Sequence, residues 1–293
     1  MNTRRQTLDR LARPLVPLYG EREARSIARL VLSELTGIGI PALIADPSAP
    51  LEAEGLDEIA ARLAAGEPVQ YVLGRTEFCG RSFSVRKGVL IPRPETEELV
   101  LWIVREEGAR LRERGPKNLD GGPFSLLDVG TGSGCIAASL KLALPEAALY
   151  AADISDKALA VAAENCRALG ADVALRRADA LADLAERFPE PFDAIVSNPP
   201  YVPQGERGAM RPNVRDYEPA EALFVPDDDP LRFYRAIARA SRRMLRPGGR
   251  LYFEIHERFA EEMLRMLDEE GYAHTRLRED MNAKPRMTCS RTE

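Results

Sequence analysis

Residues 126–134 have the sequence Leu-Leu-Asp-Val-Gly-Thr-Gly-Ser-Gly, in which a short apolar strand leads directly into alternating glycines. Glycine lets the backbone turn sharply and approach a ligand, and the free N–H groups at the start of the following helix attract an anion. The stretch therefore predicts a strand, a ligand-binding turn and a helix in immediate succession. A tight turn without a ligand is the alternative, because the glycine spacing alone is only a moderate signal.

The alternation of strand and helix continues along the chain. Helical segments separate the first five apolar strands, whereas the last two strands have no helix between them. Strands joined through helices pair in parallel with right-handed crossovers. We therefore predict a doubly wound, Rossmann-like α/β sheet of seven strands, with its ligand at the carboxyl ends of the strands and an antiparallel hairpin at one edge. The expected strands are residues 126–129, 149–154, 173–175, 192–197, 250–255, 272–278 and 287–291.

The residues before this sheet follow different patterns. Apolar side chains recur at helical spacing through residues 1–74 and prolines interrupt them, which predicts a small all-helical domain. Alternation across residues 78–91, with a turn at residues 86–88, predicts a β-hairpin linker within residues 75–95. Residues 96–293 then form the α/β domain. The helical domain carries no chemical motif, so we expect it to pack, to bind a partner, or both.

Composition restricts the class of protein. Apolar residues make up 45% and charged residues 30% of the 293 residues, as in an ordinary soluble globular protein. The net charge of -5 disfavours lasting contact with nucleic acid, whose phosphates attract basic surfaces. We find no signal peptide and no run of about 18 apolar residues, so we expect a cytoplasmic protein without membrane contact. A monomer is the default expectation.

The four cysteines, Cys79, Cys135, Cys166 and Cys289, lie far apart and form no Cys-x-x-Cys pair. Only two histidines accompany them, so neither a zinc site nor another metal centre is expected. In a long chain without a signal peptide we expect free thiols in a reducing compartment rather than disulfides.

Two acidic residues at the ends of the second and third strands extend the glycine turn into a nucleotide-like site. Asp153 lies about 20 residues beyond the glycines, where a carboxylate accepts hydrogen bonds from ribose hydroxyls. A solvated cap of the helix that begins near Ser155 is the alternative for Asp153. Asp179 closes the third strand and could reach an adenine amino group, with a plain loop carboxylate as the alternative. These features alone also admit a nicotinamide dehydrogenase.

The fourth strand, residues 192–197, is followed by Asn198-Pro199-Pro200-Tyr201. Two successive prolines cannot continue a central strand, so the peptide leaves the sheet with its carbonyls exposed. The Asn198 side-chain oxygen and the Pro199 carbonyl can each accept one N–H of a planar nitrogen, and Tyr201 can stack on a flat group. This pattern favours methyl transfer to a conjugated nitrogen through positioning, without an obligatory general base. A proline-rich strand end without chemical meaning is the alternative.

These motifs resemble the HemK-type peptide chain release factor glutamine methyltransferases over nearly the full length of the chain. The resemblance implies a class I methyltransferase fold and S-adenosylmethionine as the methyl donor. It also implies that the acceptor is the side-chain amide nitrogen of the glutamine in the Gly-Gly-Gln motif of class I release factors, which act in translation termination. The matching segments are residues 66–74, Arg93-Pro94-Glu95-Thr96-Glu97, Asn198-Pro199-Pro200-Tyr201, Tyr217-Glu218-Pro219, Phe233-Tyr234 and Arg246-Pro247-Gly248-Gly249, with a weaker echo at residues 280–287.

The resemblance further implies roles for individual residues. Ala180 stands where the family often has an aromatic residue near the adenine, and His256 replaces a family glycine, which we interpret as a polar end of a strand rather than a base. The implied cofactor-binding residues are Gly130, Thr131, Gly132, Ser133, Gly134, Asp153, Asp179, Ala180 and Asn198. The implied catalytic residues are Asn198, Pro199 and Tyr201, and Pro200 joins them in binding the substrate. Substrate recognition is implied for the helical domain, residues 1–74.

Other functions remain open on the sequence. A glutamine methyltransferase of a ribosomal protein shares the tetrapeptide, and residues 93–97 favour the release-factor branch by resemblance only. An adenine-amino methyltransferase of nucleic acid also acts on a flat nitrogen, but the net charge of -5 disfavours this function. A non-catalytic binding protein is disfavoured by the intact Asn198 and glycine turn, and a dehydrogenase leaves residues 198–201 unexplained. Arg93 and Glu95 either line the substrate opening or simply begin a helix.

Overall fold

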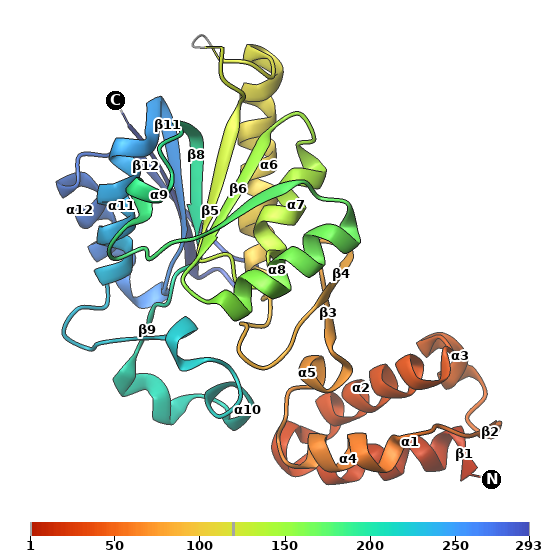
Figure 1. The fold of residues 1–293 in the computed structure, drawn as a ribbon. Helices are drawn as coiled ribbons and strands as arrows, with labels where there is room; N and C mark the ends of the chain where they lie inside the picture. Colours follow the sequence, from red (N-terminus) through yellow and green to blue (C-terminus); the bar gives the residue numbers. More distant parts are fainter. Residues whose placement is uncertain (1, 119–120, 293) are drawn as a thin grey trace. The chain divides into compact units, whose positions relative to one another are not determined.

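The computed structural model describes residues 2–118 and 121–292, and the chain divides into two compact units (Figure 1). One unit contains the residues up to Arg75 together with Arg211–Tyr217. The other contains Thr76–Met210 and the chain from Glu218 onward. Within the described residues, none of the helices has the length and apolar character needed to cross a membrane.

The first unit is mainly helical. Thr3 caps its first helix, because the Thr3 hydroxyl accepts from the Gln6 backbone N–H and the Gln6 side chain accepts from the Thr3 N–H. Two short antiparallel strands, β1 (Asn2–Thr3) and β2 (Pro50–Leu51), accompany the helices. The helices are α1 (Arg4–Ala12), η1 (Arg13–Leu15), α2 (Val16–Thr36), α3 (Ile40–Ala45), α4 (Leu56–Ala64), α5 (Val69–Leu73) and α10 (Pro212–Arg215). Their buried leucines, which form the centre of the core, include Leu11, Leu15, Leu32 and Leu63.

The segment Arg211–Tyr217 belongs to this unit although it lies far along the chain. The Tyr217 hydroxyl donates to the Ala65 carbonyl at 2.7 Å, and the Arg211 guanidinium donates to the Glu23 carboxylate at 3.0 Å. Contacts between residues so far apart along the chain produce no periodic pattern, so the sequence did not predict them.

The second unit contains the seven-stranded sheet, in the order β12-β13-β11-β8-β5-β6-β7. Neighbouring strands from β11 to β7 pair in parallel, whereas β13 pairs antiparallel with both β11 and β12. The predicted doubly wound sheet and its terminal antiparallel hairpin are therefore confirmed. The strands are β5 (Ser125–Val129), β6 (Ala148–Asp153), β7 (Val173–Arg177), β8 (Phe192–Ser197), β11 (Leu245–Glu254), β12 (Ala273–Glu279) and β13 (Pro285–Arg291).

Helices cover both faces of this sheet (Figure 1). Successive residues of a strand point to opposite faces, so Leu126 packs in one apolar layer and Leu127 in the other. Burial on both faces explains why every residue of the central strands β5 and β8 is buried. One face carries α6 (Pro94–Arg114), α7 (Cys135–Ala143) and α8 (Asp156–Leu169), and the other carries α9 (Leu184–Arg187), α11 (Arg232–Met244) and α12 (Ala260–Glu269).

Trp102, the only tryptophan of the chain, lies in α6 and is buried in the first of these layers. Its ring meets the Tyr252 ring edge-on, with centroids 5.7 Å apart, and the Arg278 guanidinium lies 4.8 Å from the indole centroid. Aromatic and cation contacts of this kind hold the side chain rigidly between α6 and the sheet.

The hairpin before α6 differs from the expected one. It consists of β3 (Arg75–Phe78) and β4 (Arg81–Ser84), and its turn lies at Cys79-Gly80 rather than at residues 86–88. The φ angles of Cys79 and Gly80 are 49° and 69°, as in the two-residue turn whose twist matches that of antiparallel strands. Residues 85–93 consequently lie outside any strand and are free to border the site described below.

Two further details were not expected. The strand β11 begins at Leu245 rather than at residue 250, and its pairing with β8 shifts register between Leu245 and Arg250. After β8 the chain also forms a small parallel pair, β9 (Val202–Pro203) and β10 (Phe224–Val225), which is too short to produce a periodic pattern. The 3-10 turns η2 (Gln204–Ala209) and η3 (Ala220–Ala222) lie between its strands, and η4 (Glu257–Phe259) follows β11.

Candidate active site

A cavity of about 290 Å³ lies at the carboxyl ends of the central parallel strands. Most of the residues predicted to bind a ligand line it, although they come from four separate strand ends. Gly134 and Tyr201 were predicted with them but are not part of the lining. The predicted residues that do line it are Gly130, Thr131, Gly132, Ser133, Asp153, Asp179, Ala180, Asn198, Pro199 and Pro200.

Hydrogen bonds to the buried Asp128 side chain hold the glycine turn between β5 and α7. Asp128 is fully buried, and its Oδ2 accepts from the Thr131 hydroxyl at 2.6 Å and from the Ala137 N–H at 3.2 Å. Gly134 has a φ of 78°, and a Cβ there would lie 3.0 Å from the Cβ of Ala162 in α8. Asp128 and Gly134 therefore shape the turn, while Gly130 and Gly132 border open space, since a Cβ on either would meet no atom within 4 Å.

Asp153 stands at the end of β6 and faces the cavity. Its Oδ2 accepts from the Gly132 N–H and its Oδ1 from the Ser155 N–H, each at 2.9 Å. Ser155 itself caps α8 through a bond from the Ala158 N–H, so the alternative of Asp153 as the helix cap is not what the structure shows. Burial raises the pKa of Asp153. A carboxylate has about four acceptor positions, so two remain for the hydroxyls of a ribose.

The third strand leads to a largely apolar wall. Asp179 Oδ1 accepts from the Leu181 N–H at 2.8 Å. This carboxylate therefore stabilises the loop after β7 and also borders the cavity. Ala180 and Leu181 line the cavity, as do Phe233 and Ile237 of α11. Phe233 supplies an aromatic side chain on the same cavity, although the position of Ala180 has none. Phe233 lies on α11, far along the chain from Ala180, which explains why the sequence did not reveal it as a cavity residue.

Asn198 lies at the end of β8 with its amide held from one side. Its Nδ2 donates to Thr96 Oγ1 at 3.3 Å, and its Oδ1 accepts no hydrogen bond from the described residues. Because Asn198 and Pro199 border the cavity, the free amide oxygen and the proline carbonyl can serve as two acceptors for one planar nitrogen.

Tyr201 is placed differently from the expectation. Its hydroxyl donates to Glu254 Oε1 at 3.1 Å, and its ring meets the His256 ring edge-on at 5.9 Å. Burial raises the pKa of Tyr201 well above its usual range. His256 accepts from the Arg258 N–H and contacts Glu206 at 3.1 Å, so it caps η4 and lies two residues beyond the end of β11 rather than ending the strand.

Residues 88–93 form another wall of the cavity. Glu218, whose side chain is 1% exposed, accepts from the Ile91 N–H at 3.1 Å and from Arg93 Nη2 at 2.6 Å. Arg93 borders the cavity and directly precedes α6, so it does begin this helix, while its role at a substrate opening stays a prediction. The sequence did not indicate the pairing with Glu218, because the partners lie far apart along the chain.

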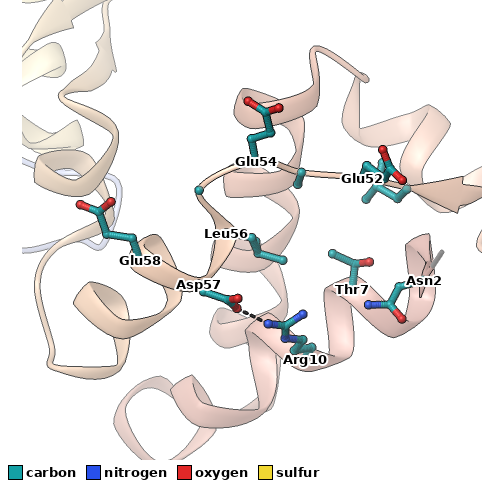
Figure 2. Close-up of a pocket in the computed structure, with 11 residues that line it drawn as sticks. Asn2, Thr7, Arg10, Glu52, Glu54, Leu56, Asp57 and Glu58 are labelled. Atoms are coloured by element: carbon teal, nitrogen blue, oxygen red, sulfur yellow. Dashed lines mark hydrogen bonds and ion pairs between the residues drawn. The ribbon is translucent and has the colours of Figure 1, made fainter.

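A second hollow, of about 450 Å³, lies in the helical unit (Figure 2). Arg10 forms an ion pair with Asp57 there, and Glu52, Glu54 and Glu58 also border it. None of the individually predicted ligand-binding residues lies in it. We therefore place the candidate active site at the sheet.

The thiols are free, as expected. Cys135 borders the cavity, but burial raises its pKa to about 12, which makes it a poor nucleophile. Across residues 2–118 and 121–292, no group of three or more His, Cys, Asp or Glu side chains is placed to hold a metal ion.

Comparison with known proteins places this chain in a family. Residues 117–211 match the Methyltransferase small domain family, and residues 15–74 match the PrmC N-terminal domain. The chain is 44% identical to the release factor glutamine methyltransferase of Bacteroides thetaiotaomicron over 93% of this chain and 94% of that protein. It is 40% identical to the enzyme of the same name from Chlorobaculum tepidum over 95% of both chains.

A solved structure shares the fold. The 16S rRNA N2 G1207 methyltransferase of T. thermophilus, solved with AdoMet and guanosine, matches with a TM-score of 0.51 and 17% identity over 75% of this chain and 50% of that chain.

The fold and the site define an S-adenosylmethionine-dependent class I methyltransferase. Within this class it is a protein-glutamine N-methyltransferase, and the chain belongs to the release factor glutamine methyltransferase family.

Proposed function

We propose that this enzyme methylates the side-chain amide nitrogen of the glutamine in the Gly-Gly-Gln motif of class I peptide chain release factors. The observation that carries the proposal is the pair of free acceptors, Asn198 Oδ1 and the Pro199 carbonyl, at a cavity shared with the glycine turn and Asp153. The relatives that match over nearly the whole chain are named for the same substrate and support this choice.

Several residues of the cavity suit the methyl donor. We propose that Asp153 binds the ribose hydroxyls and that the turn at residues 130–134 receives the amino-acid end, whose carboxylate suits the start of α7. Asp179 and Ala180 would then border the adenine, with Phe233 as an apolar neighbour. S-adenosylmethionine, when bound, supplies an electrophilic methyl group.

The residues after β8 would prepare the acceptor nitrogen. An amide nitrogen is a poor nucleophile because its lone pair is delocalised into its own carbonyl. By accepting one N–H each, Asn198 Oδ1 and the Pro199 carbonyl would hold the nitrogen and favour localisation of the lone pair toward the cavity. Pro200 and Tyr201 would shape the same subsite. A methylated amide nitrogen loses its extra proton readily, so water suffices to remove it and no base is needed.

The protein substrate is the finer part of the proposal. Residues 1–74 would recognise the release factor, because residues 15–74 match the PrmC N-terminal domain and the segment contains no residue of the cavity. Such a substrate places the enzyme in the cytoplasm. We expect it to act as a monomer without stable binding to nucleic acid.

A side-by-side transfer assay tests the proposed substrate. Purified class I release factor, ribosomal protein and nucleic acid are each offered with S-adenosylmethionine carrying a labelled methyl group. We expect label on the release factor and none after its Gly-Gly-Gln glutamine is changed to alanine. Label on ribosomal protein or nucleic acid alone would reject the proposal.

A further inference from the structure

A buried chain of hydrogen bonds lies behind the Asn198 side chain. Asn198 Nδ2 is 3.3 Å from Thr96 Oγ1, and Thr96 Oγ1 is 2.6 Å from Glu254 Oε2. The second oxygen of the same carboxylate, Oε1, lies 3.1 Å from the Tyr201 hydroxyl. Thr96 is 2% exposed and Glu254 is 1% exposed, so bulk water does not compete for these bonds.

The carboxylate fixes the direction of every bond in this chain. Burial raises the pKa of Glu254, whereas the hydrogen bonds from Thr96 and Tyr201 and the charge of Arg286 oppose that shift. When the carboxylate is ionised it can only accept, so Thr96 and Tyr201 each point their single hydroxyl hydrogen at Glu254. The Thr96 oxygen then has only lone pairs left for Asn198. The Asn198 amide can satisfy it only through its NH₂ group, which turns Oδ1 away from Thr96.

We propose that Thr96 and Glu254 are positioning residues that hold the Asn198 amide with its oxygen toward the substrate, an inference that rests on the proposed function. In the opposite orientation Asn198 would present N–H donors to the N–H groups of the substrate amide, and no hydrogen bond could form. Because Glu254 also binds Tyr201, one carboxylate orients two side chains of the tetrapeptide after β8.

Orientation and packing make different demands on Thr96. A packing role needs only the shape of the side chain, which valine reproduces. Orientation needs the hydroxyl, which serine keeps and valine lacks. Thr288 provides a matched control, because it is also a buried threonine and its hydroxyl has no hydrogen-bond partner among the described residues.

The test compares Thr96→Val, Thr96→Ser and Thr288→Val in the full chain, with kcat and KM for the release factor and with S-adenosylmethionine affinity from calorimetry. We expect Thr96→Val to lower kcat by about 10- to 100-fold, as misplacement of a reacting group does, while cofactor affinity is unchanged. Thr96→Ser should restore most of the rate, and Thr288→Val should have the rate of the unchanged enzyme.

Two results would overturn the assignment: an unchanged kcat in Thr96→Val, or an equal loss in Thr96→Val and Thr96→Ser. If Thr96→Val does not fold, Glu254→Gln replaces it. The NH₂ group of the glutamine can donate to Thr96 and so reverse the direction of the hydrogen bonds between residue 254, Thr96 and Asn198. An unchanged kcat in that variant overturns the assignment as well. If the unchanged enzyme does not label the release factor, the proposed function fails instead, and the same variants are assayed on the substrate that it does label.

Discussion

Asn198 gains its proposed role from its position at the end of a strand and from the bonds behind it. We predict that Asn198→Ala lowers kcat at least about 100-fold, because it removes an acceptor that meets the reacting amide directly. Cofactor affinity should remain, since Asp153 and the glycine turn are untouched. Asn282→Ala, at an exposed asparagine of the β12–β13 turn, is the control. Turnover that survives in Asn198→Ala would remove this residue from the mechanism.

From the raised pKa of Asp128 we predict that the free energy of unfolding depends on pH. Burial raises its pKa from 3.8 to about 7, and its Oδ1 has no hydrogen-bond partner among the described residues. The folded protein therefore binds this proton more tightly than the unfolded chain does. The resulting stabilisation is fully present below pH 3.8 and is lost as the pH rises through about 7.

Asp128→Asn keeps the shape of the side chain and removes this titration. Between pH 5 and pH 8, the free energy of unfolding of the unchanged protein should fall by about 1 to 3 kcal/mol more than that of Asp128→Asn. Urea denaturation at several pH values measures the difference. Parallel pH profiles for the two proteins would show that Asp128 does not titrate in this range.

The candidate site could be predicted from sequence only where its residues follow strands. Asp153 is the last residue of β6 and Asn198 directly follows β8, and parallel strands bring their carboxyl ends to one edge, so the approach of these two residues was foreseeable. Thr96 and Glu254 are hydrogen-bonded although they lie 158 positions apart in the chain, and no local sequence pattern predicts that contact. Tyr201 illustrates the same limit, because the sequence did not indicate that its hydroxyl donates to Glu254 on β11.

Among the elements, α7 and α8 meet at Gly134. Alanine there would combine a φ of 78° with a Cβ 3.0 Å from Ala162 Cβ and 3.1 Å from Ala162 Cα. We predict that Gly134→Ala lowers the free energy of unfolding by roughly 2 to 5 kcal/mol, the sum of backbone strain and overpacking.

Gly170→Ala separates these two causes. Gly170 ends α8 with a φ of 68° but has no atom within 4 Å of an added Cβ, so only strain applies, about 1 to 2 kcal/mol. Urea denaturation of both variants gives the comparison. Equal losses would mean that the close approach of α7 and α8 contributes nothing.

Element boundaries were harder to predict than element types. The turn of the first hairpin lies at Cys79-Gly80, because both residues take positive φ angles, and a cysteine is not a usual sign of such a turn. The sequence instead favoured residues 86–88, which contain a glycine between charged and apolar stretches. The pair β9 and β10 has two residues in each strand, which leaves no alternation to detect.

At the scale of the whole molecule, each unit has an apolar core of its own. We predict that a chain lacking residues 1–74 keeps its affinity for S-adenosylmethionine but loses most methylation of the release factor. Calorimetry and the labelled-methyl assay provide the two measurements. The deletion also leaves Arg211–Tyr217 without its partners, so the control is the intact chain with Arg211→Ala and Tyr217→Phe.

Loss of cofactor affinity together with methylation would show that the truncated chain is misfolded. Undiminished methylation of the release factor by the truncated chain would contradict a recognition role for residues 1–74.

The single tryptophan gives this molecule a built-in optical label for one unit. Trp102 is buried against Tyr252 in the α/β unit, so its fluorescence reports the melting of that unit alone. Far-ultraviolet circular dichroism, by contrast, also detects the helices up to Leu73. If the two signals change at different temperatures, the units unfold in separate steps, and the order of those steps can be read without adding any dye or tag.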